Sequence, residues 1–417
     1  MQTQLSSTYK DTAQGREADQ ILRACTHCGF CTATCPTYQL LGDELDGPRG
    51  RIYLIKEMLE GEAVTQKTQL HLDRCLTCRA CETTCPSGVQ YGRLLDIGRE
   101  IVEENVPRPQ SQRLLHFMLR AVIPYSARFT PLLRLGQMLR PLLPATLQKS
   151  VPLKQSSGIW PAARHARKML VLDGCAQPAI SPNINAAAAR VLDRLSISLV
   201  RISEAGCCGA LSYHLNAHDE GLDFMRHNID VWWPHVEKGA EAIVTTASGC
   251  GVLVKDYGHI LRHDPHYAEK AARISALTRD ISQVLMAEQS ALTRLLKAQP
   301  AKAKTKLAFH APCTLQHGQK LTGAVEQILR GCGFELTPVP DAHLCCGSAG
   351  TYSILQKDIS QQLLRNKLTA LQSGTPAAIA TANIGCLTHL QSGAKVPVRH
   401  WIEWLDEIQS FPFSAQV

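Results

Sequence analysis

The chain has 417 residues, of which 45% are hydrophobic, and a formal net charge of +8. This length predicts two or three domains with room for buried cores. Its seventeen cysteines exceed what packing requires, and their odd number argues against a closed disulfide framework. The polar N-terminus shows no signal peptide, and no apolar run reaches the length of a transmembrane helix. We therefore expect a protein of the reducing cytoplasm whose cysteines serve metal or redox chemistry.

Two cysteine motifs of identical spacing stand near the N-terminus. Residues 25–36 have the sequence CTHCGFCTATCP, and residues 75–86 have the sequence CLTCRACETTCP. Both follow the pattern C-x2-C-x2-C-x3-C-P, which is the spacing of a bacterial-type ferredoxin loop. Three cysteines at two-residue gaps let one short loop reach three corners of a cubane cluster, whose iron prefers soft thiolate ligands. The two motifs therefore predict two 4Fe-4S clusters.

The fourth cysteine of each motif is expected to bind the cluster of the other motif. We assign Cys25, Cys28, Cys31 and Cys85 to cluster 1, and Cys75, Cys78, Cys81 and Cys35 to cluster 2. The alternative is structural zinc, whose ligand pairs are usually separated by a dozen or more residues. Two compact runs of four cysteines disfavour that alternative.

The segments that follow the motifs have apolar residues at helical spacing. In residues 47–61, Ile52, Ile55 and Leu59 recur at this spacing, and Gly61 is placed to end the helix. Residues 91–105 also predict a helix. We therefore expect residues 1–104 to form a helical ferredoxin domain, which resembles the domain found in iron–sulfur subunits of respiratory dehydrogenases.

The basic character of the chain lies in residues 105–172, which contain no Asp or Glu. The basic residues of this segment are Arg108, Arg113, Arg120, Arg128, Arg134, Arg140, Lys149, Lys154, Arg164, Arg167 and Lys168. Prolines at positions 124, 131, 141 and 144 predict short amphipathic helices separated by breaks. We interpret residues 105–167 as a basic helical linker. Its apolar side either docks on an anionic membrane surface or an acidic partner, or packs on the next domain. No nucleic-acid-binding motif accompanies the charge, so we expect no nucleic-acid partner.

A second internal repeat occupies the remainder of the chain. Cys175, Cys207 and Cys208 recur 138 residues later as Cys313, Cys345 and Cys346, and Cys250 recurs as Cys386. Residues 168–175 and 306–313 predict strands that end at a cysteine, and residues 240–247 and 376–383 predict strands that lead to the last cysteine of each repeat. Residues 186–197 and 323–334 predict helices. We expect two α/β repeats, over residues 168–300 and 301–417, with their cysteines gathered at one edge of each sheet.

These motifs resemble a known family. GC-x2-P followed by CCG and a further cysteine is similar to the cysteine-rich CCG domain of heterodisulfide reductases, lactate-utilisation proteins and glycolate oxidase iron–sulfur subunits. Longer strings, such as SEAGCCGALSYHLNAH and HLCCGSAGTYS, resemble the glycolate oxidase iron–sulfur subunits most. The fold class implied is a multidomain α+β protein, in which a helix-rich ferredoxin-like domain precedes a duplicated α/β CCG domain.

The resemblance implies an electron-transfer subunit of a complex that oxidises glycolate to glyoxylate. In that family FAD is carried by separate flavoprotein subunits, and this chain shows no flavin-binding motif, so we expect no flavin on it. Electrons would pass to an acceptor such as a membrane quinone, with the chain in the cytoplasm or peripheral on the inner membrane. The alternatives are the iron–sulfur subunit of a D-lactate or glycerol-3-phosphate dehydrogenase, and a thiol–disulfide enzyme of the heterodisulfide-reductase kind.

The CCG repeats depart from the five-cysteine pattern of heterodisulfide reductases. Where that pattern closes with C-x-x-C, the first cysteine of the closing pair is replaced by Ala247 in one repeat and by Asn383 in the other. The remaining cysteines of one or both repeats hold a further cluster, or they are a thiol site, a disulfide-forming pair or a structural remnant, and these alternatives stay open. These cysteines are Cys175, Cys207, Cys208, Cys250, Cys313, Cys345, Cys346 and Cys386. We interpret the nearby histidines at positions 310, 317, 343 and 389 as hydrogen-bonded side chains, with a ligand or proton relay among them as the alternative. No residue is predicted to be an acid–base catalyst.

Overall fold

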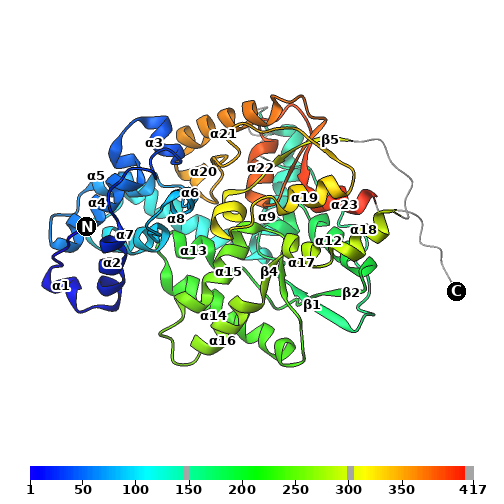
Figure 1. Cartoon of the computed structure of the whole chain (residues 1–417), viewed down its shortest axis with the longest axis horizontal. Helices are drawn as coiled ribbons and strands as arrows, with labels where there is room; N and C mark the ends of the chain where they lie inside the picture. The colour runs from blue at the N-terminus through cyan, green and yellow to red at the C-terminus, as the bar shows by residue number, and fades with distance from the viewer. Residues whose placement is uncertain (145–147, 149–150, 298–304, 409–417) are drawn as a thin grey trace.

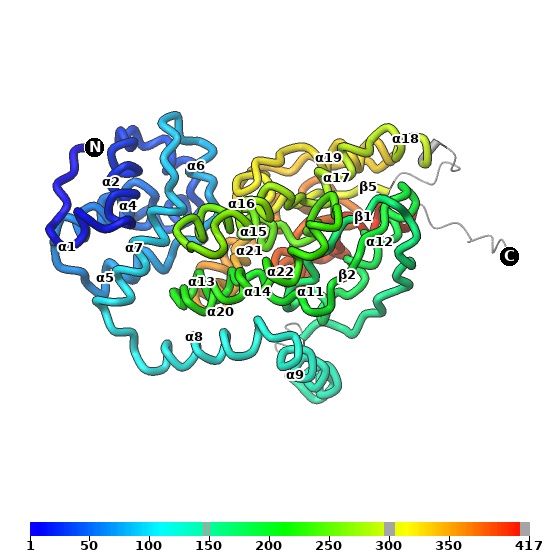
Figure 2. The backbone as a smooth tube through the Cα atoms, turned by 90° about the horizontal axis from the view of Figure 1, so that it is seen from below, coloured from blue at the N-terminus to red at the C-terminus, as the bar shows by residue number. Residues whose placement is uncertain are grey.

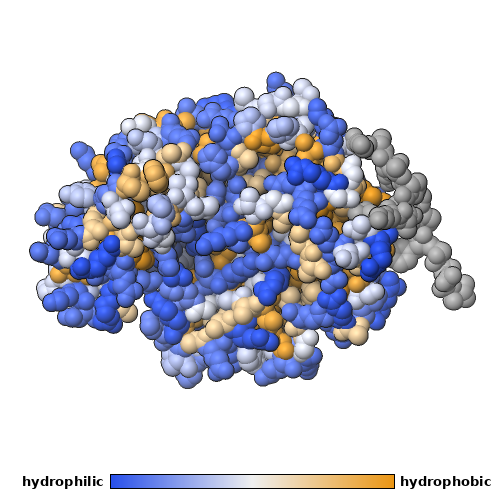
Figure 3. Space-filling model, viewed as in Figure 1, coloured by the Kyte–Doolittle hydropathy of each residue, from blue (hydrophilic) through white to orange (hydrophobic). Residues whose placement is uncertain are grey.

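The computed structural model describes residues 1–144, 148, 151–297 and 305–408. Lys149 of the basic segment and the expected boundary between residues 300 and 301 lie outside this part of the chain. A helical N-terminal part lies beside two α/β units (Figure 1). Over the face shown in Figure 3, apolar residues are dispersed among hydrophilic ones.

The N-terminal part is built from helices around its own apolar core. Its elements are α1 (Ser7–Lys10), α2 (Ala13–Ala24), α3 (Pro36–Leu41), η1 (Glu44–Asp46), α4 (Pro48–Glu60), α5 (Gln66–Asp73), α6 (Ala80–Thr84) and α7 (Tyr91–Asn105). The helices predicted after the two motifs are confirmed as α4 and α7, and Gly61 caps α4 with a left-handed φ of 104°. Ile55 and Leu94 are fully buried between these elements. This core fixes the positions of the two cysteine loops.

The basic segment forms an arm along one side of the molecule (Figure 2). It consists of α8 (Gln110–Val122), α9 (Ser126–Leu139) and the short helix η2 (Arg140–Leu142). The predicted break at Pro131 is wrong, because Pro131 lies inside α9. Pro131 is the sixth residue of that helix, so the helix continues past it at the cost of the one backbone hydrogen bond that its missing N–H would have made.

Each α/β unit contains a four-stranded parallel sheet within the described residues. The strand orders are β2-β1-β3-β4 and β6-β5-β7-β8. The first unit comprises β1 (Arg167–Val171), α11 (Gln177–Ile180), α12 (Asn183–Arg194), β2 (Ile197–Arg201), α13 (Ala210–His214), α14 (His218–Glu237), β3 (Ile243–Thr245), α15 (Ser248–Ile260), α16 (Ala268–Leu277), β4 (Thr278–Asp280), α17 (Ile281–Ala287) and α18 (Gln289–Lys297). The second comprises β5 (Lys306–His310), η3 (Thr314–Gly318), α19 (Ala324–Gly331), β6 (Glu335–Leu336), α20 (Tyr352–Leu355), α21 (Lys357–Gln372), β7 (Ala378–Thr381), α22 (Ile384–Gln391), β8 (Val398–His400) and α23 (Trp401–Ile408).

The two sheets share one apolar core. Met169 and Val171 of β1 face this core, while Leu170 and Leu172 face the opposite side of the sheet, as the two-residue period of a strand requires. Leu307 and Phe309 of β5 enter the shared core from the second sheet. A strand buried on both faces needs a continuous apolar run, which is what the sequence has at both positions. The expected α+β class with a duplicated α/β part is confirmed, although β2, β4, β6 and β8 were not predicted.

The N-terminal part contacts the first α/β unit through ion pairs that involve histidine. Glu17 lies 2.9 Å from Nε2 of His259, and Glu100 lies 3.3 Å from Nδ1 of His218. Burial alone would lower the pKa of His218, but the hydrogen bond and charge of Glu100 outweigh it and raise the pKa. The charged form of His218 therefore strengthens this contact.

We expect the contribution of His218 to stability to depend on pH. Because its pKa is raised on folding, this contribution is fully present below about pH 6.5, the ordinary pKa of histidine, and is lost as the pH rises through the folded value. The urea midpoint of a His218→Gln variant should fall below that of the wild type at pH 6, and the gap should narrow at pH 8. The exposed His263 supplies the control substitution, His263→Gln. A gap that is the same at both pH values would contradict the assignment.

Candidate metal centres

The two ferredoxin-type loops adopt the same backbone geometry. His27 and Gly29 of the first loop have positive φ values of 55° and 84°, and the corresponding Thr77 and Arg79 have 51° and 59°. Left-handed conformations at non-glycine residues are costly and persist where the surroundings demand them. Here they turn successive cysteines of each loop toward one side. Apart from Gly29, no residue type in the motif signalled these conformations.

The structure brings the fourth cysteine of each motif to the loop of the other. One cavity is lined by the thiols of Cys25, Cys28, Cys31 and Cys85, and a second by those of Cys35, Cys75 and Cys78. Cys81 lies between them and lines both. A short helix adjoins each of these two cysteines. Cys85 directly follows α6, and Cys35 directly precedes α3.

Burial makes the thiols of these cavities hard to ionise without a cation. It raises the pKa of Cys31 to about 11, with the neighbouring Cys25 as the next contribution. It also raises the pKa values of Cys78 and Cys81 well above the ordinary range. Iron binding must therefore displace the thiol protons and stabilise several thiolates at once. Two cavities with converging soft donors fit iron–sulfur clusters, and the eight cysteines named above would hold them.

A buried cation stands behind the second loop, in a network that the sequence analysis missed. Asp46 is fully buried and accepts hydrogen bonds from Arg51 at 3.4 Å and from Arg74 at 2.7 Å, with Nδ1 of His71 at 3.0 Å. Arg51 also donates to the hydroxyl of Thr37, and that hydroxyl lies 3.3 Å from the sulfur of Cys35. The positive charge is thus held one residue contact away from the thiol of Cys35.

The environment of Arg51 favours its charged form. Burial alone would lower its pKa, but Cys75, Tyr91, Cys35 and Asp46 outweigh burial and raise it. A fixed buried cation beside thiolates lowers the free energy of negative charge at the second loop.

In the first α/β unit, four thiols meet at the carboxyl edge of the sheet. Cys175 follows β1, Cys207 and Cys208 precede α13, and Cys250 lies in the first turn of α15. Hydrogen bonds from Cys207 and Cys250 lower the pKa of the buried Cys208 thiol. The structure thus brings together all four predicted cysteines of this repeat.

The second unit repeats the arrangement. Cys313 follows β5, Cys345 and Cys346 lie in the loop before α20, and Cys386 lies in the first turn of α22. The sulfur atoms of Cys313 and Cys345 are 3.8 Å apart. The side chain of Cys346 also interacts with those of Cys345 and Cys386.

The glycine of each CCG motif is required by a close approach of two backbones. Gly209 and Gly347 have φ values of 91° and 89°. A Cβ atom would stand 2.7 Å from the carbonyl oxygen of Gly221 in the first unit, and 2.6 Å from that of Ser360 in the second. The amide of each glycine donates to the first cysteine of its pair, at 3.5 Å in Cys207 and 3.4 Å in Cys345.

The thiols of the second unit adjoin those of the second ferredoxin-type loop. Cys78 packs against an apolar cluster that contains Cys313 and Cys345, and Cys313 contributes after burial to the raised pKa of Cys78. The hydroxyl of Tyr352 donates to the carbonyl of Arg74 at 2.9 Å across the same contact. Three thiol sites therefore follow one another through the protein. This adjacency joins residues more than 200 positions apart, so no local sequence signal could have predicted it.

The two positions that lack a cysteine lie where the repeats meet. Ala247 precedes α15, and the amide of the nearby Gly249 donates to the side chain of Asn383 at 3.1 Å. The amide nitrogen of Asn383 lies 3.6 Å from the sulfur of Cys386. Asn383 therefore contacts the thiol site through a hydrogen bond to sulfur.

The histidines of the second repeat differ in whether their ring nitrogens have hydrogen-bond partners. His317 contacts the hydroxyl of Thr83 at 3.1 Å and the carbonyl of His343 at 2.9 Å, and His389 contacts Ser360 at 3.2 Å. These contacts confirm the interpretation of both as hydrogen-bonded side chains. The Nε2 atom of His310, by contrast, is buried without a hydrogen-bond partner among the described residues.

We expect Arg51→Met to destabilise the protein by about 3–5 kcal/mol, because it removes one partner of a buried ion pair. Arg49 lies in the same helix and pairs with Glu44 at 2.7 Å on the surface, so Arg49→Met is the matched control. Its cost should stay below about 1 kcal/mol. Urea unfolding followed by far-UV circular dichroism measures both, and equal costs would show that burial of the Arg51 pair is unimportant.

Comparisons with known proteins agree with this arrangement. A family model described as a 4Fe-4S dicluster domain matches residues 21–89, and a model described as a cysteine-rich domain, CCG, matches residues 169–255 and 307–391. The glycolate oxidase iron-sulfur subunit of Escherichia coli strain K12 is 58% identical over 98% of this chain and 99% of its own length. The "Probable glycolate oxidase iron-sulfur subunit" of Bacillus subtilis strain 168 is 29% identical over 94% of this chain and 92% of its own length.

A more distant relative covers part of the chain. Lactate utilization protein A of Bacillus licheniformis is 26% identical over 52% of this chain and 87% of its own length. The match to the Escherichia coli protein has a higher identity and covers nearly the whole chain, so it extends over both cysteine motifs and both cysteine-rich repeats. The chain therefore belongs to the family of glycolate oxidase iron–sulfur subunits, the electron-transfer subunits of an oxidoreductase.

Proposed function

We propose that this chain carries electrons away from glycolate within a multisubunit complex. FAD-bearing flavoprotein subunits would oxidise glycolate to glyoxylate, and this chain would pass the electrons to a membrane quinone. The observation that carries the proposal is the succession of three adjoining thiol sites, which leads from the N-terminal loops into the second repeat. The 58% identity to a glycolate oxidase iron-sulfur subunit supports the choice of substrate.

The residues of this chain hold and tune the electron-carrying groups. Cys25, Cys28, Cys31 and Cys85 would hold one 4Fe-4S cluster, and Cys75, Cys78, Cys81 and Cys35 the other. When bound, these clusters supply one-electron transfer, which divides the electron pair of a reduced flavin. The buried charge of Arg51 favours the more negative, reduced state at the second loop.

Iron and acid-labile sulfide per chain test this assignment on anaerobically purified protein. We expect about eight irons for two cubane clusters, and about twelve to sixteen if the repeats carry further clusters. Cys85→Ser should remove about four irons, because it takes one ligand from the first cluster. Cys332→Ser is the control, since Cys332 lies in none of the four thiol groups. A chain that holds zinc in place of iron would overturn the assignment.

Reduction by substrate tests the proposed role in the complex. The isolated chain should not oxidise glycolate, whereas the chain co-purified with its flavoprotein partners should bleach in the visible range when glycolate is added. The match to a lactate utilization protein supports lactate as the second candidate substrate, which the sequence motifs had suggested as D-lactate. Faster bleaching with D-lactate would favour that alternative, and thiol–disulfide exchange by the isolated chain would favour a heterodisulfide-reductase-like enzyme.

We further propose that the α8–α9 arm docks on an anionic membrane surface. Large apolar side chains of the arm are exposed: Leu114, Phe117, Met118, Leu132, Leu135, Met138 and Leu142 are each at least 50% accessible. Arg113 and Arg134 are exposed among them. Apolar residues interleaved with cations suit the boundary between lipid headgroups and acyl chains. None of the described helices combines the length and the apolar composition needed to cross a bilayer.

Vesicle flotation measures this docking. We expect the full chain to bind vesicles that contain phosphatidylglycerol more tightly than vesicles of phosphatidylcholine alone. Neutralising two arginines, as Arg113→Gln with Arg134→Gln, should weaken binding by about 2 kcal/mol, or about thirtyfold, since each basic residue near the surface contributes about 1 kcal/mol. Arg365→Gln on α21 is the exposed control. Equal binding of both vesicle types would contradict the proposal.

A further inference from the structure

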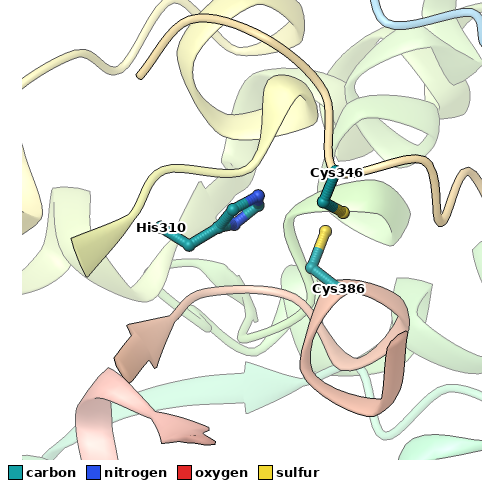
Figure 4. Close-up of side chains that lie close together, drawn as sticks. All are labelled: His310, Cys346 and Cys386. Atoms are coloured by element: carbon teal, nitrogen blue, oxygen red, sulfur yellow. The ribbon is translucent and has the colours of Figure 1, made fainter. Parts of the chain in front are cut away.

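His310 is a buried histidine that faces a group of thiols. It is the last residue of β5 and is only 2% accessible. Its ring points toward the sulfur atoms of Cys346 and Cys386, which come from the CCG loop and from α22 (Figure 4). A buried ring nitrogen without a partner is costly, so its persistence calls for a ligand.

The other ring nitrogen is already engaged in the manner of a metal-bound histidine. Nδ1 of His310 lies 3.1 Å from the hydroxyl of Thr381 on the neighbouring strand β7. Histidines that bind a metal through one nitrogen usually donate the other N–H to a nearby oxygen, which fixes the ring orientation and the tautomer. Donation from Nδ1 to Thr381 leaves the lone pair of Nε2 directed at the two thiols.

The spacing of the donors suits one metal ion. Nε2 or Nδ1 of His310 and the sulfurs of Cys346 and Cys386 lie within 4.8 Å of one another. Two thiolates on a tetrahedral zinc are separated by about 3.8 Å when each Zn–S bond is about 2.3 Å. Thiolates bound to different irons of a cluster would be spread more widely.

The first repeat does not share this feature. The 138-residue displacement that relates Cys175 to Cys313 places Leu172 opposite His310, and Leu172 is buried in apolar core. The first unit therefore offers four thiols, and the second offers four thiols and one imidazole. In donor number the histidine restores what the substitution at Asn383 removed.

We propose that His310 binds a metal through Nε2, and that it shares one tetrahedral ion with Cys346, Cys386 and a further thiol of the second repeat. The ion is a divalent metal that accepts both imidazole and thiolate, which zinc and iron do. Binding displaces the thiol protons to solvent and leaves the His310 imidazole neutral. The two repeats are then unequal, and this centre is the one adjoining the second ferredoxin-type loop.

Metal analysis of the full-length protein tests the proposal independently of glycolate oxidation. The variants are His310→Ala, His310→Cys, which restores a soft donor, and His400→Ala. His400 is the matched control, because it is fully buried and ends the strand β8, two strands away at the same sheet edge. Both of its ring nitrogens are engaged, with the carbonyl of Thr246 at 2.9 Å and the amide of Ile402 at 3.2 Å.

We expect His310→Ala to lose the metal of this centre while His400→Ala and His310→Cys retain it. In the wild type, X-ray absorption at the zinc edge should show one nitrogen among sulfur ligands if the ion is zinc. If it is iron, pulsed electron paramagnetic resonance after mild oxidation of the centre to the ferric state should show an imidazole nitrogen coupling, because the oxidised 4Fe-4S clusters are then diamagnetic. Either nitrogen signal should vanish in His310→Cys. The ferredoxin-type cluster signals serve as the internal check on folding, and His310→Cys carries the test if His310→Ala does not fold.

Two results would overturn the proposal. One is a His310→Cys variant with the metal content and the nitrogen signal of the wild type. The other is a Cys346→Ser variant with the same metal content as the wild type, because the second repeat of the wild type would then hold no metal.

Discussion

The structure depends on bringing thiols that are distant in sequence into the same buried cavities. Cys35 and Cys85 each cross to the loop of the other motif, so the two loops and the helices between them must fold as one body. Burial raises the pKa of Cys31, Cys78 and Cys81, so these thiols by themselves are a poor place for negative charge. Iron supplies the positive charge that the site lacks, and folding of this part is therefore coupled to metal binding.

The duplicated α/β part places a second set of thiols next to those of the ferredoxin-type loops. Parallel strands deliver their carboxyl ends to one edge of a sheet, and each repeat uses that edge for its cysteines. The two sheets share a core, so the position of one edge fixes the position of the other. The second edge lies against the second ferredoxin-type loop, and this contact turns separate sites into a succession.

Charged residues surround the three adjoining thiol sites without being among the thiols that line them. The buried network of Arg51, Asp46 and His71 places a cation behind the second loop without exposing it to solvent. At the other side of the N-terminal part, Glu17 and Glu100 pair with histidines of the first unit. The basic arm exposes large apolar side chains on both α8 and α9, although Leu119 of α8 is buried.

The sequence by itself determined the features that depend on local spacing. The interval of two residues between cysteines, the apolar runs before Cys175 and Cys313, and the helices at 48–60 and 91–105 follow from short-range geometry, and the structure has them where they were predicted. Only the tertiary structure decided what those features meet. The burial of Arg51, the contact between Cys78 and Cys313, and the orientation of His310 toward Cys346 arise from packing between residues far apart in the chain. A local pattern carries no record of its partner, because the free energy that selects such contacts is gained only when the whole fold excludes water from them.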